Sequence, residues 1–252
     1  MRIIIRENAE ELSKIAAQQI IDGYTPGMRL GVATGSTPLG LYKALREAHA
    51  AGDFSMAGSS AWALDEYVGI PADHPERYFN VLHTELVKDG GVGLFEADLH
   101  TPDGGAEDPK AAAKEYDAAI APGVDIQILG LGRNGHIGFN EPGGGLASRT
   151  HVDVLTASTR EANARFFDND MDRVPTFCVT QGLGTIMSAK KIVLLAFGTD
   201  KAEAVEQLIE GAVSQLWPAT VLQHHVDVTV YIDEAAASRL ELLDYYRTLE
   251  QL

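Results

Sequence analysis

The sequence has little of what would direct a protein to a membrane or to an oxidising compartment. It contains a single cysteine, Cys178, so disulfide bonds are not part of its design. No apolar run approaches the roughly 18 residues that span a bilayer. The apolar run within MRIIIRENAEEL is too short for a signal peptide and soon turns acidic. We therefore expect a cytoplasmic protein with no membrane partner.

The sequence also lacks an excess of basic residues. Its 36 Asp and Glu residues outnumber its 20 Lys and Arg residues, which gives a formal net charge of −16. Binding to a phosphate backbone needs a basic face, so nucleic acid is not an expected partner. An anionic ligand would have to be held against the overall field by a local cluster of cations and backbone N–H groups.

No linker rich in Pro, Gly or Ser divides the 252 residues, and no internal repeat is present. Short runs that are continuously apolar alternate with helical patterns, which is typical of strands buried on both faces of a parallel sheet. The sequence thus predicts one α/β domain over residues 1–252, doubly wound and Rossmann-like, with a mostly parallel central sheet. The expected strands lie at 29–34, 60–65, 124–132, 191–198 and 226–233. The expected helices lie at 8–20, 38–52, 74–88, 110–121, 200–211 and near the C-terminus, with a surface loop at 98–109.

Four of the predicted strands end in unusual polar residues. The ends read VAT-GSTP, WAL-DEY, GLG-RNGH and AFG-TDK. Ligands of open parallel sheets bind beyond the carboxyl ends of the strands, so these four segments are expected to meet. Loops after strands are commonly polar and rich in glycine, but four such loops together favour a site.

The segment TGSTP predicts an anion site. Gly35 allows close approach of the backbone, Ser36 and Thr37 supply hydroxyl groups, and the free N–H groups at the following helix attract negative charge. Lys201 and Arg165 could reach the same anion. The alternative for the segment is a plain Thr37 cap before Pro38.

The stretch GLGRNG matches the dinucleotide fingerprint G-x-G-x-x-G letter for letter. That fingerprint requires its last glycine to open a helix. Here Gly135 is followed by HIGFNEPGGG, whose glycines and Pro142 exclude a sustained helix. We therefore do not expect this stretch to bind a nicotinamide cofactor.

The same loop carries a candidate acid/base group. His136 is flanked by glycines, with Asn134 before it and Asn140 and Glu141 after it. A carboxylate and an amide that fix the imidazole tautomer are typical of a general acid/base. The alternatives are a histidine that caps a strand end and a metal ligand. No second histidine stands at ligand spacing, so no metal is predicted.

Asp65 and Glu66 end the predicted strand at 60–65. Adjacent strand residues point to opposite faces, so only one of them can readily face the site. A carboxylate at this place is a candidate base for removing a proton from carbon. The alternative is an aspartate that caps a loop.

Taken together, these segments resemble a known family nearly end to end. The blocks that carry the resemblance are ATGSTPLGLYKAL, LDEYVGI, LGLGRNGHIGFNEPG, LASRTHVDVLTASTR, ANARFFDND and VTQGLGTIMSAKKIVLLAFGTDKA. The chain resembles the glucosamine-6-phosphate deaminases, within the wider family of sugar-phosphate isomerases and deaminases. The resemblance implies a cofactor-free reaction in which glucosamine 6-phosphate and water give fructose 6-phosphate and ammonia.

The resemblance also implies roles for the candidate residues. Asp65 would accept the C2 proton of the open-chain sugar, and His136 would open the pyranose ring. Asn134 and Glu141 would orient that imidazole. The substrate phosphate would be held by Gly35, Ser36, Thr37, Arg165 and Lys201. Residues from about 155 to 178 would form a mobile lid.

Two positions depart from the pattern of well-known members. Some members carry Asp where this chain has Asn134, an amide that also occurs in the family. Members activated by N-acetylglucosamine 6-phosphate have a basic pair just after SRT and hydroxyl residues just after EP; this chain has His151, Asp153 and glycines 143–145 there. We therefore expect that activation to be absent or weak.

The resemblance leaves several functions open. They are a galactosamine-6-phosphate deaminase or related isomerase, a 6-phosphogluconolactonase, and a sensing domain that binds sugar phosphate without catalysis. The NEPG and LDEYVG blocks favour a deaminase over a lactonase. Sensors of this kind carry a DNA-binding helix-turn-helix, for which this chain has neither the segment nor the charge. Both monomers and homo-oligomers occur in the family.

Overall fold

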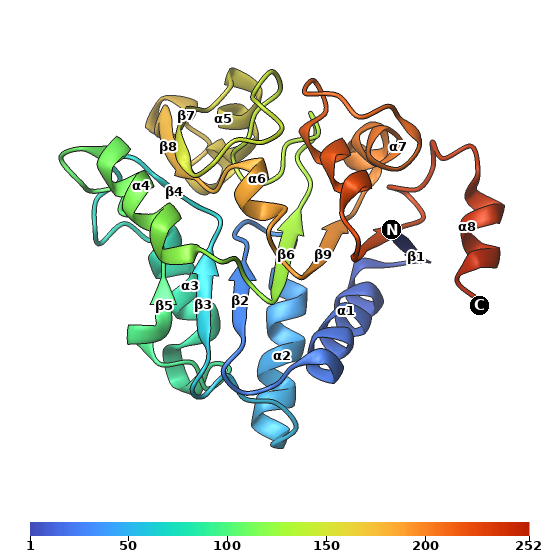
Figure 1. Ribbon diagram of the computed structural model, residues 1–252, viewed down its shortest axis with the longest axis horizontal. Coiled ribbons are helices and arrows are strands. Elements are labelled where there is room, and N and C mark those ends of the chain that lie inside the picture. The colour runs from blue at the N-terminus through green and yellow to red at the C-terminus, as the bar shows by residue number, and fades with distance from the viewer. Residues whose placement is uncertain (252) are drawn as a thin grey trace.

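A parallel sheet forms the centre of the protein in the computed structural model, which describes residues 1–251 (Figure 1). Its seven strands run in the order β1-β10-β9-β6-β2-β3-β5, and every neighbouring pair is parallel. The strands are β1 (Arg2–Arg6), β2 (Arg29–Val32), β3 (Ser60–Ala63), β5 (Leu99–His100), β6 (Ile126–Gly130), β9 (Lys191–Ala196) and β10 (Val228–Asp233). Because both faces are covered, the inner strands are apolar throughout rather than alternating.

Helices cover both faces, as right-handed crossovers require. From β1 to β2, β3 and β5 the chain moves in one direction across the sheet, which places the intervening helices on one face. It then moves back through β6, β9 and β10, which places the later helices on the other. The helices are α1 (Ala9–Gly23), α2 (Leu39–Ala51), α3 (Tyr78–Leu86), α4 (Pro109–Ile120), α6 (Leu183–Ile186), α7 (Ala202–Glu210) and α8 (Leu243–Leu249), of which α8 packs against the edge strand β1.

The direction of winding reverses between β2 and β6, which are neighbours in the sheet. The loop after β2 leaves toward one face, and the loop after β6 leaves toward the other. A crevice therefore opens beyond the carboxyl ends of these two strands, where doubly wound proteins bind their ligands.

A small antiparallel sheet lies over this end of the main sheet. It contains β4 (Asp65–Tyr67), β8 (Phe177–Thr180) and β7 (His151–Val154) in the order β4-β8-β7. The helix α5 (Ala157–Asn163) connects β7 toward β8 and lies beside them at the top of the molecule (Figure 1). A separate hydrophobic cluster supports this layer; it consists of Tyr67, Ile70, Phe139, Leu155, Ala164, Phe167, Val174 and Cys178.

Short 3-10 helices fill several of the connections. They are η1 (Lys88–Gly90), η2 (Glu96–Asp98), η3 (Ala164–Phe166), η4 (Met171–Arg173), η5 (Thr199–Lys201) and η6 (Pro218–His224). Of these, η3 and η4 continue the layer that α5 begins. In residues 1–251 there is no helix with the length and apolar character to cross a bilayer.

The structure confirms the predicted α/β class and mostly parallel sheet, and it corrects several local predictions. The segment 98–109 is not only loop, because β5 pairs with β3 there. The helix expected from 74 begins at Tyr78, and the helix expected from 200 begins at Ala202, after η5. The edge strand β1 and the whole antiparallel sheet were not predicted. The cap at Asn8 is present, since its side chain accepts the N–H of Glu11 at 2.9 Å.

Candidate active site

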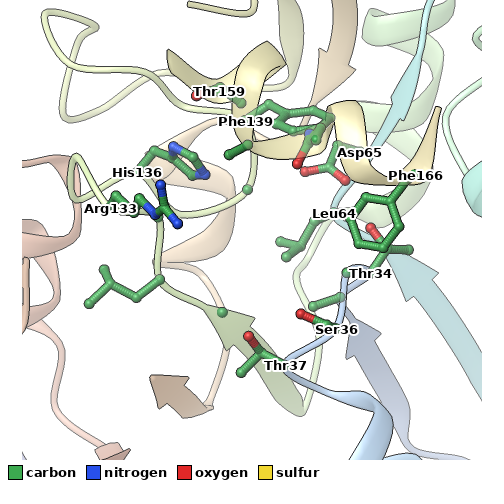
Figure 2. Close-up of a pocket in the computed structure, with 18 of the residues that line it drawn as sticks. Thr34, Ser36, Thr37, Leu64, Asp65, Arg133, His136, Phe139, Thr159 and Phe166 are labelled. Atoms are coloured by element: carbon green, nitrogen blue, oxygen red, sulfur yellow. The ribbon is translucent and has the colours of Figure 1, made fainter. Parts of the chain in front are cut away.

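A cavity of about 760 Å³ lies at the crevice between β2 and β6. All four polar strand ends line it, which confirms that these segments converge. The lining residues from them are 33–37, 64–65, 67, 130–134, 136 and 197–201. Figure 2 shows Asp65 and His136 on opposite sides of this space, with Ser36 and Thr37 at its lower end.

Asp65 reaches the cavity because the chain leaves the main sheet immediately before it. Leu64 separates β3 from β4, and its backbone bonds to both Val32 and Gln181. The side chain of Asp65 is almost fully buried at 5% exposure. Burial, followed by the nearby charge of Glu66, raises the pKa of Asp65 well above its ordinary value. A carboxylate whose pKa is raised in this way is a stronger base than an aspartate in water.

Glu66 points away from the cavity, as the alternation along a strand requires. It is fully buried and accepts the backbone N–H groups of Tyr67, Tyr78 and Phe79, each at 3.0 Å. Two of these N–H groups belong to the first turn of α3. Glu66 therefore anchors a helix, and only Asp65 of the two acidic residues is placed for chemistry.

The loop after β6 presents His136 to the cavity. Gly132 lies directly beneath the imidazole: a Cβ atom added there would come within 2.4 Å of His136 Nδ1. Gly135 has a φ of +80°, which favours glycine. The N–H of Gly132 donates to the carbonyl of His136 at 2.8 Å and closes the loop. No helix follows Gly135, so the dinucleotide fingerprint does not have its structural counterpart.

Glu141 and Asn134 lie next to His136, as the sequence predicted. Asn134 Nδ2 donates to Glu141 Oε2 at 2.8 Å, and Asn134 Oδ1 accepts the N–H of His136 at 3.3 Å. Glu141 Oε2 lies 3.8 Å from His136 Nδ1, too far for a hydrogen bond. Burial lowers the pKa of His136, while Glu141 opposes and Lys201 adds to this shift. The imidazole is therefore held neutral near pH 7, able to accept a proton.

Asn140 does not belong with these groups, although it was counted among the functional side chains of the loop. It is buried, and its Nδ2 donates to the carbonyls of Ile137 at 2.9 Å and Gln181 at 2.8 Å. These bonds join the loop to the chain after β8. Asn140 thus braces the loop and is not among the residues that line the cavity.

The opposite end of the cavity is electropositive. Gly35, with a φ of +88°, turns the chain so that Ser36 and Thr37 lead into α2. Pro38 occupies the capping position and makes no side-chain cap, so the predicted alternative of a Thr37 cap is wrong. The N–H groups of the first helical turn lack helical partners and, with the helix dipole, attract an anion.

Arg165 and Lys201 add two cations to this end. Arg165 Nη2 donates to Ser36 Oγ at 3.1 Å, although the two residues are far apart in sequence. Burial, together with the charges of Arg133 and Arg165, lowers the pKa of Lys201 to about 8. The positive charge of this half-buried lysine, near the charges of Arg133 and Arg165, is stabilised by a bound anion. This end can hold a phosphate.

Several lining residues were not singled out from the sequence. Arg133 lies beside His136 and forms an ion pair with Asp200 at the rim. From the segment 155–178, the lining residues besides the predicted Arg165 are Ser158, Thr159, Ala162, Asn163 and Phe166. Arg133 stands within the quoted GLGRNG, but its neighbours in sequence do not reveal its pairing with Asp200. The residues of the segment 155–178 carry no sequence pattern that separates lining side chains from the rest.

Comparisons with known proteins agree with this geometry. The family described as glucosamine-6-phosphate isomerases/6-phosphogluconolactonase matches residues 4–231. The glucosamine-6-phosphate deaminases of Beutenbergia cavernae and Mycolicibacterium smegmatis are each 53% identical over 251 residues, covering 98% of this chain and 95% of theirs.

Solved structures show the same relationship. A monomeric glucosamine-6-phosphate deaminase, described as a missing link of the NagB superfamily, superposes with a TM-score of 0.91 at 42% identity, covering 94% of this chain and 99% of that one. The 6-phosphogluconolactonase of Trypanosoma cruzi has a TM-score of 0.74 at 24% identity, covering 95% of this chain and 97% of that one, and so shares the fold. The family predicted from the sequence is confirmed: the chain belongs to the glucosamine-6-phosphate isomerases and 6-phosphogluconolactonases.

Proposed function

We propose that the protein is a glucosamine-6-phosphate deaminase. It converts glucosamine 6-phosphate and water into fructose 6-phosphate and ammonia, without a cofactor. The observation that carries the proposal is the 53% identity, nearly end to end, to relatives of that name. The cavity supports it, because a carboxylate and an imidazole lie on opposite walls and an anion site lies at one end (Figure 2).

The phosphate of the substrate binds at the electropositive end. The backbone at Gly35, the hydroxyls of Ser36 and Thr37, and the cations of Arg165 and Lys201 hold it there. This binding energy acts far from the reacting carbons and fixes the sugar between Asp65 and His136. It also explains how a chain with a net charge of −16 binds an anion.

His136 opens the ring. The neutral imidazole takes the proton of the anomeric hydroxyl and returns a proton to the ring oxygen, which yields the open-chain aldehyde. Asn134 and Glu141 hold in place the loop that carries the imidazole for this step.

Asp65 then removes the proton from C2. The electrons move toward C1 and give an enolamine, and return of a proton to C1 leaves an imine at C2. Water adds to that carbon and ammonia departs, which leaves the ketone of fructose 6-phosphate. The raised pKa of Asp65 makes it a base strong enough to act on a weakly acidic carbon, provided that the intermediate is stabilised nearby.

The segment from about 155 to 178 serves as a lid over these steps. It carries α5, and its side chains line one wall of the cavity. A lid that closes over the enolamine excludes bulk water and limits side reactions. We further propose that the enzyme works in the cytoplasm, either as a monomer or as a homo-oligomer.

The decisive experiment measures release of ammonia and of fructose 6-phosphate from purified protein. Stoichiometric release of both from glucosamine 6-phosphate is expected. Galactosamine 6-phosphate, tested in parallel, decides which epimer is preferred. Hydrolysis of 6-phosphogluconolactone with no release of ammonia would instead identify a lactonase, and saturable binding without turnover would identify a sensor.

A further inference from the structure

We propose that Thr156 is a positioning residue that holds Glu141 away from His136, and that the lid acts on proton transfer at the imidazole through this contact. The inference rests on the proposed function and adds a residue to its machinery. It starts from an unusual feature of the site: the acidic partner of the histidine is bonded to other groups on both of its oxygens.

The bonds of Glu141 account for the gap to His136. Glu141 Oε1 accepts both the N–H and the hydroxyl of Thr156, each at 3.2 Å. Glu141 Oε2 accepts Asn134 Nδ2 at 2.8 Å. These bonds hold Oε2 at 3.8 Å from His136 Nδ1, and that nitrogen is buried without a hydrogen-bond partner among residues 1–251. A buried imidazole nitrogen left unpaired next to a carboxylate is costly, so something must restrain the carboxylate.

The direction of the Thr156 bond follows from its second role. Thr156 caps α5, and its hydroxyl oxygen accepts the N–H of Thr159 at 3.2 Å. The hydroxyls of Thr156 and Thr159 are also 3.1 Å apart. A carboxylate can only accept, whereas the hydroxyl of Thr159 can donate. The Thr156 hydroxyl therefore donates its single proton in a hydrogen bond to Glu141.

This contact is one of the places where the lid segment is fastened to the site. Farther along, Asn163 Nδ2 donates to Tyr67 Oη at 3.0 Å, and Arg165 bonds to Ser36. Of these three contacts, the one at Thr156 alone touches Glu141. Movement of α5 away from the cavity would thus remove two donors from Glu141 and free it to turn toward His136.

The charges around His136 give the sign of the effect. Glu141 acts on the ring from its own loop and raises the pKa, whereas Lys201, at the end of η5, lowers it together with burial. Arg133 on the same loop is paired with Asp200, and Asp65 lies on the opposite wall. When Glu141 closes on Nδ1, the pKa of His136 rises. The imidazole is therefore neutral while Thr156 holds Glu141, and it binds a proton more tightly when these bonds are broken.

The test follows the titration of His136 directly, by NMR of substrate-free protein with labelled histidine. His136→Gln identifies the signal among the 8 histidines. In Thr156→Val the midpoint is expected to rise by about half a pH unit or more, because the isosteric side chain cannot donate. Thr156→Ser keeps the hydroxyl and should restore the wild-type midpoint. Asn163→Ala removes the hydrogen bond to Tyr67 but keeps both donors of Thr156 on Glu141, so it should leave the midpoint where it is.

The same variants are then compared in turnover. In Thr156→Val the acidic limb of kcat/KM should move to higher pH together with the NMR midpoint, whereas Asn163→Ala should change KM or kcat without moving that limb. An unshifted midpoint in Thr156→Val, or an equal shift in Asn163→Ala, overturns the inference. The NMR arm needs no turnover, so failure of the proposed deaminase activity would leave a shifted midpoint intact and can be told apart.

Discussion

At the scale of single residues, the proposal assigns separate chemistry to the two walls of the cavity. Asp65 carries a raised pKa because it is buried beside Glu66, and His136 carries a lowered one because it is buried beside Lys201. Burial thus favours the uncharged form of both groups, the protonated carboxyl of Asp65 and the neutral imidazole of His136. Such pairs are typical of acid/base catalysis.

Asp65→Asn removes the proposed base and keeps the shape of the side chain. We expect turnover of glucosamine 6-phosphate to fall by about 10²–10⁴-fold, the usual contribution of a general base. Binding of the substrate should persist, because the phosphate site is at the other end of the cavity. Steady-state kinetics and calorimetric binding measure the two effects, and a variant that retains most of its turnover would rule out Asp65 as the base.

His136→Gln tests ring opening separately from enolisation. We expect the loss in rate to be greatest for the closed pyranose, since an amide cannot move the proton of the anomeric hydroxyl at neutral pH. Substrate presented as its open-chain form by rapid mixing should be turned over with a smaller loss. Equal losses for both forms would contradict the assigned role.

The lowered pKa of Lys201 leads us to expect that substrate binding depends on pH. Its pKa of about 8 means that the free enzyme loses this positive charge as the pH rises through 8. A lysine binds phosphate only while protonated, so kcat/KM should fall above that pH. The amino group of the substrate titrates in the same range, and Lys201→Arg isolates the contribution of the enzyme because arginine stays charged. A pH profile of this variant that coincides with the wild type would assign the fall to the substrate alone.

At the scale of the elements, the strand–helix alternation could be read from the sequence, but the break at Leu64 could not. WALDEY reads as one strand because the apolar residues of β3 run directly into Asp65. The change of sheet is fixed by pairing of β4 with β8, more than a hundred residues later. Such non-local pairing leaves no local mark. The edge strand β5 was missed for the opposite reason: its two residues stand within a polar stretch.

Glu66 joins β4 to α3, and its replacement should lower the stability of the fold rather than the rate of the reaction. Its buried carboxylate accepts three backbone N–H groups, two of them at the start of α3. In Glu66→Gln the amide NH₂ would face N–H donors, so we expect the free energy of unfolding to drop by about 1–3 kcal/mol. Urea denaturation measures the change, with the exposed Glu7→Gln as the control. A Glu66→Gln protein as stable as this control would contradict the anchoring role.

At the scale of the whole molecule, the position of the site could be predicted because topology determines it. Once strands and helices alternate, the polar strand ends must meet at one edge of the sheet, and residues as distant as Ser36 and Lys201 line one cavity. The roles of neighbours could not be read in this way. Asn140 and Glu141 are adjacent and both polar, yet only the structure shows that Asn140 braces the loop and that Glu141 accepts hydrogen bonds from Thr156. The mobility of the lid stays a prediction.

The absence of activation by N-acetylglucosamine 6-phosphate also belongs to this scale, because an activator site acts on the whole fold. The positions that hold the basic pair in activated members lie on β7, where His151 Nε2 contacts Asp153 Oδ2 at 3.4 Å. Burial raises the pKa of Asp153, but its hydrogen bonds to His151 and to backbone N–H groups outweigh burial and lower the pKa overall. Asp153 is therefore charged at neutral pH and repels a phosphate. Its charge and hydrogen bond raise the pKa of His151, whose positive charge is therefore retained below that raised value and lost above it. Above the raised pKa of His151, a phosphate thus meets more negative charge at this place, and the glycines at 143–145 offer no hydroxyl.

We expect that saturating activator changes the half-saturating substrate concentration by less than about twofold, equivalent to under 0.5 kcal/mol of coupling. Substrate saturation curves with and without the activator check this, and a clear leftward shift at pH 8 would show that another surface of the molecule binds it.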